Sequence, residues 1–163
     1  MLLYHGSNQA VAKPRIIEQT HGLDFGTGFY LTSIEKQAIS FSKYVLNRRK
    51  TGASIVSVYE YDEKNAQNML DIAIFPEPNA DWLEFIRDNR LKIYNGKQYD
   101  IIFGPVANDN VFLTVQAFLI GQFTVEAALV ALRPYKLYNQ YCFATEKALS
   151  MLTYIKSYNA EGD

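Results

Sequence analysis

Two periodicities of apolar and polar positions alternate along the chain and predict a mixture of strands and helices. Runs rich in β-branched and aromatic residues predict strands at 2–6, 28–32, 54–61, 69–75 and 140–144. Two further runs, 91–94 and 98–103, flank Asn95-Gly96. Because this pair is typical of a tight turn, these runs predict a hairpin in the middle of the chain.

Apolar residues at helical spacing predict five helices, most of which follow a polar capping residue. The predicted helices are 34–50 behind Ser33, a short helix behind Asn79 that carries Trp82, Phe85 and Ile86, 110–120, 125–133 behind Thr124, and 146–156 behind Thr145. The polar segment 157–163 is typical of a frayed chain end.

The order of these segments bears on the fold class. Strands and helices follow one another without regular βαβ alternation, which favours an α+β fold with an antiparallel or mixed pair of sheets. The chain has 163 residues, enough for one domain with a proper core. We therefore expect a single domain over 1–156 and a tail over 157–163.

Composition excludes several kinds of protein. A net charge of −1 gives no overall attraction to nucleic acid or acidic membranes, although Arg48-Arg49-Lys50 is a local basic cluster. The single cysteine, Cys142, excludes an intramolecular disulfide and a cysteine-rich metal site. No apolar run approaches the roughly 20 residues that span a bilayer, and no signal peptide is apparent. We expect a cytoplasmic protein without a membrane anchor.

Two short segments carry the chemistry of the sequence. The first is Tyr4-His5-Gly6-Ser7, and the second runs from Asp24 through Gly26-Thr27-Gly28 to Tyr30. Two glycines around a small residue form a tight turn that lets the backbone approach a ligand. A dinucleotide-binding phosphate loop would require a third glycine and an immediate helix, whereas 29–32 is strand-like. The second segment therefore predicts a different kind of pocket wall.

Together these segments resemble the nicotinamide-binding half of ADP-ribosyltransferases of the diphtheria-toxin and poly-ADP-ribose-polymerase kind. The resemblance implies a split pair of small antiparallel or mixed β-sheets with flanking helices, NAD as co-substrate and no metal. It implies that His5 bonds the nicotinamide ribose, that Gly6 binds the carboxamide through its main chain, and that Ser7 adds a hydroxyl. On its own, a histidine at a strand end is more often structural.

The same resemblance assigns the aromatic walls of the pocket. Gly28 leads into Tyr30, whose ring would lie against the nicotinamide face, and Phe41 would cover the opposite face. A planar cationic ring is attracted to electron-rich aromatic faces by about 0.5–2 kcal/mol. Alternatively, Tyr30 is a core residue of its strand and Phe41 belongs to the core of its helix.

The third catalytic position of the family is an acidic residue near the start of a late strand, where this chain has Gln140. A glutamate would accept hydrogen bonds from the ribose 2′-hydroxyl and stabilise positive charge at C1′; glutamine keeps the acceptor and loses the charge. Glu126 and Glu146 lie on predicted helices and are poorer substitutes. The glutamine implies either slower, acceptor-dependent chemistry or an inactive relative.

Nearly the whole chain resembles a bacterial family of unknown function grouped with the ADP-ribosyltransferases. The shared features are the Tyr-His-Gly start, the Asp-Phe-Gly-x-Gly-Phe-Tyr segment, a Gly-Pro-Val turn at 104–106 and a glutamine before a late strand. In that group Gln140 is normal, and Asn108 and Asp109 are candidates for acceptor recognition, or else helix caps. Relatives often look like toxins of toxin–antitoxin pairs.

The sequence thus predicts a mono-ADP-ribosyltransferase with His5, Tyr30 and Gln140 as catalytic residues. Its expected partners are NAD, a protein or nucleic-acid acceptor and an antitoxin protein. The alternative is a catalytically inactive NAD-binding, nucleotide-binding or protein-interaction module on the same fold. A third hypothesis, an unrelated α+β scaffold, places His5 and Tyr30 far apart, and side chains on opposite faces would eliminate both other hypotheses.

Overall fold

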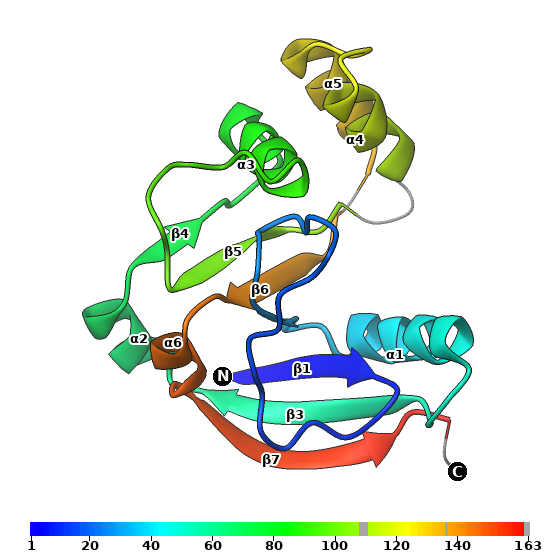
Figure 1. The fold of residues 1–163 in the computed structure, drawn as a ribbon, viewed down its shortest axis with the longest axis vertical. Helices are drawn as coiled ribbons and strands as arrows, with labels where there is room; N and C mark the ends of the chain where they lie inside the picture. Colours follow the sequence, from blue (N-terminus) through cyan, green and yellow to red (C-terminus); the bar gives the residue numbers. More distant parts are fainter. Residues whose placement is uncertain (108–110, 136, 162–163) are drawn as a thin grey trace.

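The computed structural model describes residues 1–107, 111–135 and 137–161, which form two small sheets and six helices (Figure 1). The strands are β1 (Leu2–Ser7), β2 (Phe29–Leu31), β3 (Ile55–Tyr61), β4 (Ile72–Ile74), β5 (Ile101–Pro105), β6 (Asn139–Phe143) and β7 (Leu152–Asn159). The helices are α1 (Glu35–Arg49), α2 (Glu63–Met69), α3 (Ala80–Arg90), α4 (Phe112–Leu119), α5 (Val125–Leu132) and α6 (Glu146–Leu149). The protein is α+β, as predicted.

The two sheets differ in the number and direction of their strands and share one backbone bridge. One has the order β1-β3-β7 and is antiparallel throughout, and the other has the order β2-β6-β5-β4 and is parallel only between β4 and β5. An isolated antiparallel bridge between Tyr4 and Thr32 joins the edge of β1 to the end of β2. Among the described residues, the backbone ladders of the two sheets are therefore joined only at this bridge.

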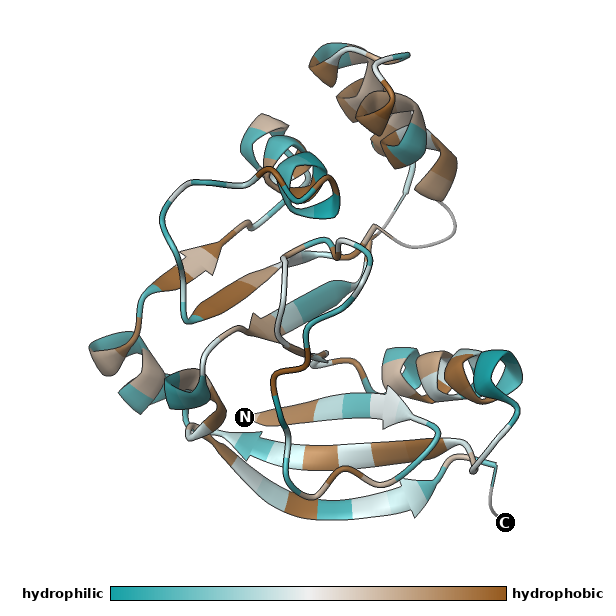
Figure 2. Cartoon of the chain, viewed as in Figure 1, coloured by the Kyte–Doolittle hydropathy of each residue, from teal (hydrophilic) through white to brown (hydrophobic). Residues whose placement is uncertain are grey.

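Three apolar clusters hold these layers together. One lies between the four-stranded sheet and α3, α4 and α5, with Trp82 and Ile102 as members, and a second joins the two sheets through Leu3 and Phe143. The third packs α1 on β3 through Ala38 and Val56. Figure 2 shows hydrophobic residues along much of α4 and α5, the helices that pack on the four-stranded sheet.

The long connection over 8–28 links the two sheets before β2 begins, and Figure 1 shows it crossing in front of both. At the three-stranded sheet, the Val11 N–H donates to Ser57 Oγ at 3.0 Å. At the other sheet, Lys92 Nζ donates to the Gln19 carbonyl at 2.9 Å. This connection is consequently fixed to both halves of the molecule.

Most predicted elements are confirmed. The strands at 2–6, 28–32, 54–61 and 140–144 appear as β1, β2, β3 and β6, and 69–75 contains the shorter β4. The caps Asn79, Thr124 and Thr145 all accept backbone hydrogen bonds, for example from the Trp82 N–H at 2.9 Å.

The predicted hairpin around Asn95-Gly96 is wrong. Residues 91–94 form no strand, because β5 pairs instead with β4 and β6. The N–H groups of Ile93 and Tyr94 donate to the Asp88 carbonyl at 2.8 and 3.1 Å, so the segment folds back on the end of α3.

The predicted C-terminal helix is also wrong beyond its first turn. Helix α6 ends at Leu149, and 152–159 forms β7 against β3. Residues 157–159, predicted to lie in a frayed tail, belong to this strand and pair with β3 residues 55–57. Edge pairing with β3 supplies the backbone hydrogen bonds that a frayed end would leave to water.

Two smaller differences concern helix beginnings. Ser33 does not cap α1, since the capping position is Ile34, and its N–H donates to Thr32 Oγ1 at 3.1 Å. Helix α2 was not predicted, and Asp62 caps it by accepting from the Asn65 N–H at 3.1 Å. Among the described residues, no helix combines the length and apolarity needed to cross a membrane.

Candidate functional site

The two sheets part immediately beyond the bridge between β1 and β2. The Tyr4 N–H donates to the Thr32 carbonyl at 2.8 Å, and the Thr32 N–H donates back to the Tyr4 carbonyl at 3.0 Å. The same antiparallel register would next pair Gly6 with Tyr30. Instead, His5 Nδ1 lies 2.8 Å from the Tyr30 carbonyl oxygen. The imidazole thus takes over the hydrogen bond that the ladder would have given to Gly6.

Gly6 is left with an open main chain at this point. Its N–H and C=O point to the same edge of β1 as those of Tyr4, away from β3, because backbone groups alternate along a strand. Neither group has a backbone partner among the described residues. A Cβ here would lie 2.1 Å from the Ala38 carbonyl oxygen of α1. Only glycine therefore fits against the backbone of α1 at this position.

His5 is held in one protonation state and one tautomer. The side chain is half-buried, and its ring stacks on Phe29 with centroids 4.4 Å apart. Burial lowers the pKa of His5 below its ordinary 6.5, so the imidazole is neutral at pH 7. Because a carbonyl only accepts, Nδ1 carries the proton toward Tyr30 and Nε2 keeps a free lone pair. His5 can therefore accept a hydrogen bond from a hydroxyl.

Tyr30 is fixed by the turn that precedes its strand. Its hydroxyl donates to the Gly26 carbonyl at 2.6 Å and accepts from the Phe25 N–H at 3.1 Å. Burial raises the pKa of Tyr30 well above its ordinary value, so the hydroxyl stays protonated. The ring packs with the helical side of the four-stranded sheet, where its cross-strand neighbour is Cys142.

The structure places the His5 and Tyr30 side chains on opposite sides of β2, as the unrelated-scaffold hypothesis expects, but it does not place the two residues far apart. The imidazole stacks on Phe29, so the two rings leave β2 on different sides. They are nevertheless adjacent, since His5 Nδ1 bonds the Tyr30 main chain at 2.8 Å. The strands separate here, at the edge of β1.

Gln140 is buried on β6, on the same side of the sheet as Tyr30. It is 9 % exposed and lies opposite Gly104 of β5, which has no side chain to cover it. Its Nε2 donates to Asp24 Oδ2 at 3.3 Å. The carboxylate only accepts, so this contact orients the amide with Oε1 directed away from Asp24.

Asp24 and Arg90 form an ion pair behind this glutamine. Arg90 Nε donates to Asp24 Oδ1 at 2.6 Å, and the side chains are 18 % and 13 % exposed for Arg90 and Asp24. One carboxylate therefore accepts from both the guanidinium and the amide. A buried carboxylate paired in this way holds its partners in one geometry.

The neighbouring residue Asn139 fixes the start of β6 against the end of β2. Its Oδ1 accepts from the Ser33 N–H at 3.3 Å and from Ser33 Oγ at 3.1 Å, and it lies 3.2 Å from Thr32 Oγ1. These contacts hold Gln140 next to the bridge where the sheets part.

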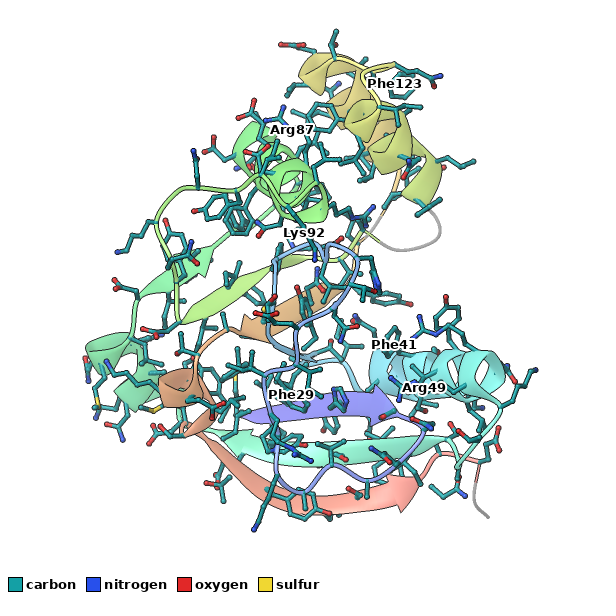
Figure 3. The ribbon with its side chains drawn as sticks, in the orientation of Figure 1. Phe29, Phe41, Arg49, Arg87, Lys92 and Phe123 are labelled. Atoms are coloured by element: carbon teal, nitrogen blue, oxygen red, sulfur yellow. The ribbon has the colours of Figure 1, made fainter. Side chains whose placement is uncertain are left out.

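Phe41 lies on α1 and is 52 % exposed (Figure 3). One turn earlier, Gln37 Oε1 accepts from Thr32 Oγ1 at 2.9 Å, which marks this side as facing β2. Ile39, on the other side, packs with the cluster over β3. Phe41 is thus not a core residue.

The remaining predicted residues have simpler surroundings. Ser7 ends β1, and Gly28 leaves no room for a side chain because a Cβ would lie 2.4 Å from Cys142 Sγ. Glu126 and Glu146 are exposed in the first turns of α5 and α6. Asn108 and Asp109 lie outside the described residues.

A pocket of about 300 Å³ lies on the other side of the 25–28 turn. It separates the 18–27 connection from the segment after α3, and its walls include His21, Gly26, Lys92 and Gln98. It touches the candidate site only through Gly26, whose carbonyl binds the Tyr30 hydroxyl. Among the described residues, no group of three or more His, Cys, Asp or Glu side chains could hold a metal ion.

Sequence reasoning missed two residues of this site. Asp24 stands within the glycine-containing segment but received no role, and Arg90 is 66 residues away at the end of α3. A charged residue directly before a Phe-Gly-x-Gly turn was the available signal for Asp24. No sequence signal near Arg90 indicated a role in the site.

A family model described as "Protein of unknown function (DUF3990)" matches residues 1–154. The chain belongs to this family. Among curated proteins and among solved structures, none matches the chain. The function of this DUF3990 protein is therefore argued from its own site.

Proposed function

We propose that the chain is an NAD-dependent mono-ADP-ribosyltransferase that transfers ADP-ribose from NAD to an acceptor. The observation that carries the proposal is the open Gly6 main chain at the point where β1 and β2 part. It lies between the His5–Tyr30 contact and α1, and Gln140 lies on the adjoining strand of the other sheet.

The Gly6 main chain suits a carboxamide. An amide offers one acceptor and one donor side by side, and the free N–H and C=O of Gly6 offer the complementary pair. Tyr30 supplies an aromatic wall fixed by its hydrogen bonds to the 25–26 turn, and Phe41 supplies an exposed ring on α1. A nicotinamide bound here would be oriented by hydrogen bonds at one end and by ring contacts on its faces.

Two neutral acceptors, on opposite sides of β2, are available to the ribose. His5 Nε2 has a lone pair because the proton is on Nδ1, and Gln140 Oε1 is directed away from Asp24. Each can accept a hydrogen bond from a ribose hydroxyl. In this proposal Asp24 and Arg90 are positioning residues, because they act on the substrate through Gln140.

The reaction requires no net redox change. The acceptor nucleophile forms a bond to C1′ of the nicotinamide ribose while the C1′–N bond breaks and its electron pair returns to the pyridinium nitrogen. Neutral nicotinamide leaves, and the acceptor proton passes to solvent. The residues at the site orient the two reactants, and orientation alone lowers a barrier by up to about 7–11 kcal/mol.

The uncharged Gln140 is compatible with this chemistry. Positive charge that develops at C1′ is balanced in part by the amide oxygen dipole, whose direction the Asp24 contact fixes. Binding energy from the rest of NAD contributes to the same transition state. By the family resemblance we extend the proposal to a toxin that an antitoxin protein restrains.

Competition by small carboxamides tests the nicotinamide site. We expect NAD to bind the purified chain measurably in calorimetric titration and nicotinamide to compete. Nicotinic acid, which has the same ring, should compete at least about tenfold less well, because its carboxylate cannot donate to the Gly6 carbonyl. Equal competition by the two compounds would contradict the assignment of a carboxamide site at Gly6. Absence of NAD binding would contradict the whole proposal.

A further inference from the structure

A stripe of exposed aromatic and basic side chains leads away from the candidate site along α1. Phe41, Tyr44 and Arg48 recur at helical spacing on one side of the helix. The first two are 52 % and 55 % exposed with ring centroids 6.0 Å apart, and the Arg48 guanidinium lies 5.7 Å from the Tyr44 ring centroid. These three residues are the α1 stripe.

The position of the stripe follows from the packing of its helix. Ala38, Ser42 and Val45 are the buried face of α1. The stripe lies on the side that begins with Gln37, which bonds Thr32 at the junction of the two sheets. It therefore borders the open edge of β1 and extends outward from Gly6. Figure 3 labels Phe41 near the start of this line.

The segment that carries the stripe is positively charged although the chain is not. Residues 36–59 contain no aspartate or glutamate, whereas the net charge of the whole chain is −1. The basic residues of this segment are Lys36, Lys43, Arg48, Arg49 and Lys50. Such a local concentration attracts a polyanion without making the whole protein basic.

Exposed aromatic faces among cations fit one class of ligand best. Single-stranded nucleic acid offers unstacked bases that stack on aromatic rings and phosphates that pair with basic side chains. A duplex hides its base faces, and a purely apolar partner would not need the cations. We propose that the α1 stripe binds single-stranded nucleic acid and presents one of its bases to the candidate site as the acceptor of ADP-ribose. The role of the base as acceptor rests on the proposed function.

The transfer to such an acceptor balances without a further reagent. A nucleobase nitrogen forms the bond to C1′ of the nicotinamide ribose as the C1′–N bond of NAD breaks. The electron pair of that bond goes to the nicotinamide nitrogen, and the proton of the base goes to solvent. The products are ADP-ribosylated nucleic acid, nicotinamide and a proton.

Fluorescence anisotropy with a short labelled single-stranded DNA or RNA, and with the same sequence as a duplex, tests the surface without NAD. We expect Tyr44→Ala to weaken single-strand binding about fivefold or more. Arg48→Ala should lower the slope of log affinity against log salt concentration by about 0.7. Lys64→Ala on α2 and Leu113→Ala on α4 are exposed controls that should change neither quantity. Unchanged binding in both stripe variants, or a preference for the duplex, would overturn the proposal.

A second assay separates this proposal from the proposed function. The oligonucleotide is incubated with NAD and analysed by mass spectrometry, and nicotinamide is measured in the same reaction. Labelled oligonucleotide that is lost in Tyr44→Ala, with nicotinamide release to water retained, supports the acceptor assignment. Nicotinamide release without labelled oligonucleotide overturns that assignment alone. Oligonucleotide binding without nicotinamide release from any acceptor overturns the proposed function and leaves the binding surface in place.

Discussion

The Asp24 carboxylate lies 3.3 Å from the Gln140 amide nitrogen, although 116 residues separate the two in sequence. Its other oxygen accepts from Arg90 at 2.6 Å. Gln140 is therefore held by a buried acid behind it. These contacts fix the orientation of the uncharged Gln140 amide.

Replacing this acid tests the positioning role. In Asp24→Asn the amide of the new residue can donate as well as accept, so Gln140 loses its fixed orientation. We expect kcat for nicotinamide release to fall about ten- to a hundredfold, with little change in the KM for NAD. Steady-state kinetics measure both constants. A rise in KM with kcat unchanged would assign Asp24 to substrate binding instead.

A second ion pair provides a matched control. Asp71 and Lys97 are 2.7 Å apart but 61 % and 57 % exposed. Solvent weakens such pairs, so Asp71→Asn should change neither activity nor unfolding. Asp24→Asn, by contrast, leaves Arg90 poorly paired and should lower the free energy of unfolding by about 1–3 kcal/mol. Equal effects in the two variants would show that the site pair has no special role.

Gly6 is expected to tolerate no side chain. In Gly6→Ala the new Cβ would meet the backbone of α1, 2.1 Å from the Ala38 oxygen and 2.8 Å from the Ser42 nitrogen. We expect a loss of about 1–3 kcal/mol or more in denaturant unfolding, because helix and strand must separate. Gly121→Ala is the comparison, since nothing lies within 4 Å and only its positive φ of 78° opposes alanine. A smaller loss for Gly6→Ala than for Gly121→Ala would contradict this packing.

His5 should make stability depend on pH. Its pKa is lowered in the folded state, so below about pH 6.5 the unfolded chain binds a proton that the folded chain excludes. The stabilisation is present above that pH and is lost as the pH falls through the folded pKa. We expect the free energy of unfolding of wild type to fall more steeply below about pH 6.5 than that of His5→Gln. Parallel curves of unfolding free energy against pH for the two proteins would show that the imidazole is solvated rather than buried.

Cys142 should be unreactive in the folded protein. Burial raises the pKa of its thiol to about 12, and its sulfur lies 3.9 Å from the Phe25 carbonyl oxygen. A thiol reagent should label the chain only after denaturation, because the thiolate is the reactive form. Rapid labelling without denaturant would mean that the turn before β2 opens.

The chemistry-bearing segments could be found in the sequence because each is contiguous. His5 with Gly6, and Gly28 with Tyr30, are a few residues apart and carry a turn or strand signal. The structure brings these two segments together through one hydrogen bond of 2.8 Å from His5 Nδ1 to the Tyr30 carbonyl. Arg90 could not be found in this way, since its partner Asp24 is 66 residues away and the end of a helix is an ordinary place for an arginine.

The errors in secondary structure have local causes. Leu149, Leu152 and Ile155 are three residues apart, which imitates the apolar spacing of a helix across the turn between α6 and β7. The Asn95-Gly96 signal depends on two flanking strands, but 91–94 has no strand partner because both edges of β5 are occupied. Pairing between distant strands decided both cases, and local sequence does not encode it.

Release of nicotinamide from NAD labelled in its nicotinamide ring tests the central claim most directly. Purified wild type and Gln140→Ala are each incubated with a cell lysate that supplies acceptors, and NAD binding is measured in parallel. The account predicts release and transfer by wild type, and loss of both in Gln140→Ala with NAD binding largely retained. Full release by Gln140→Ala would contradict the role of Gln140, and binding of NAD by wild type without any release would leave a non-catalytic nucleotide-binding module.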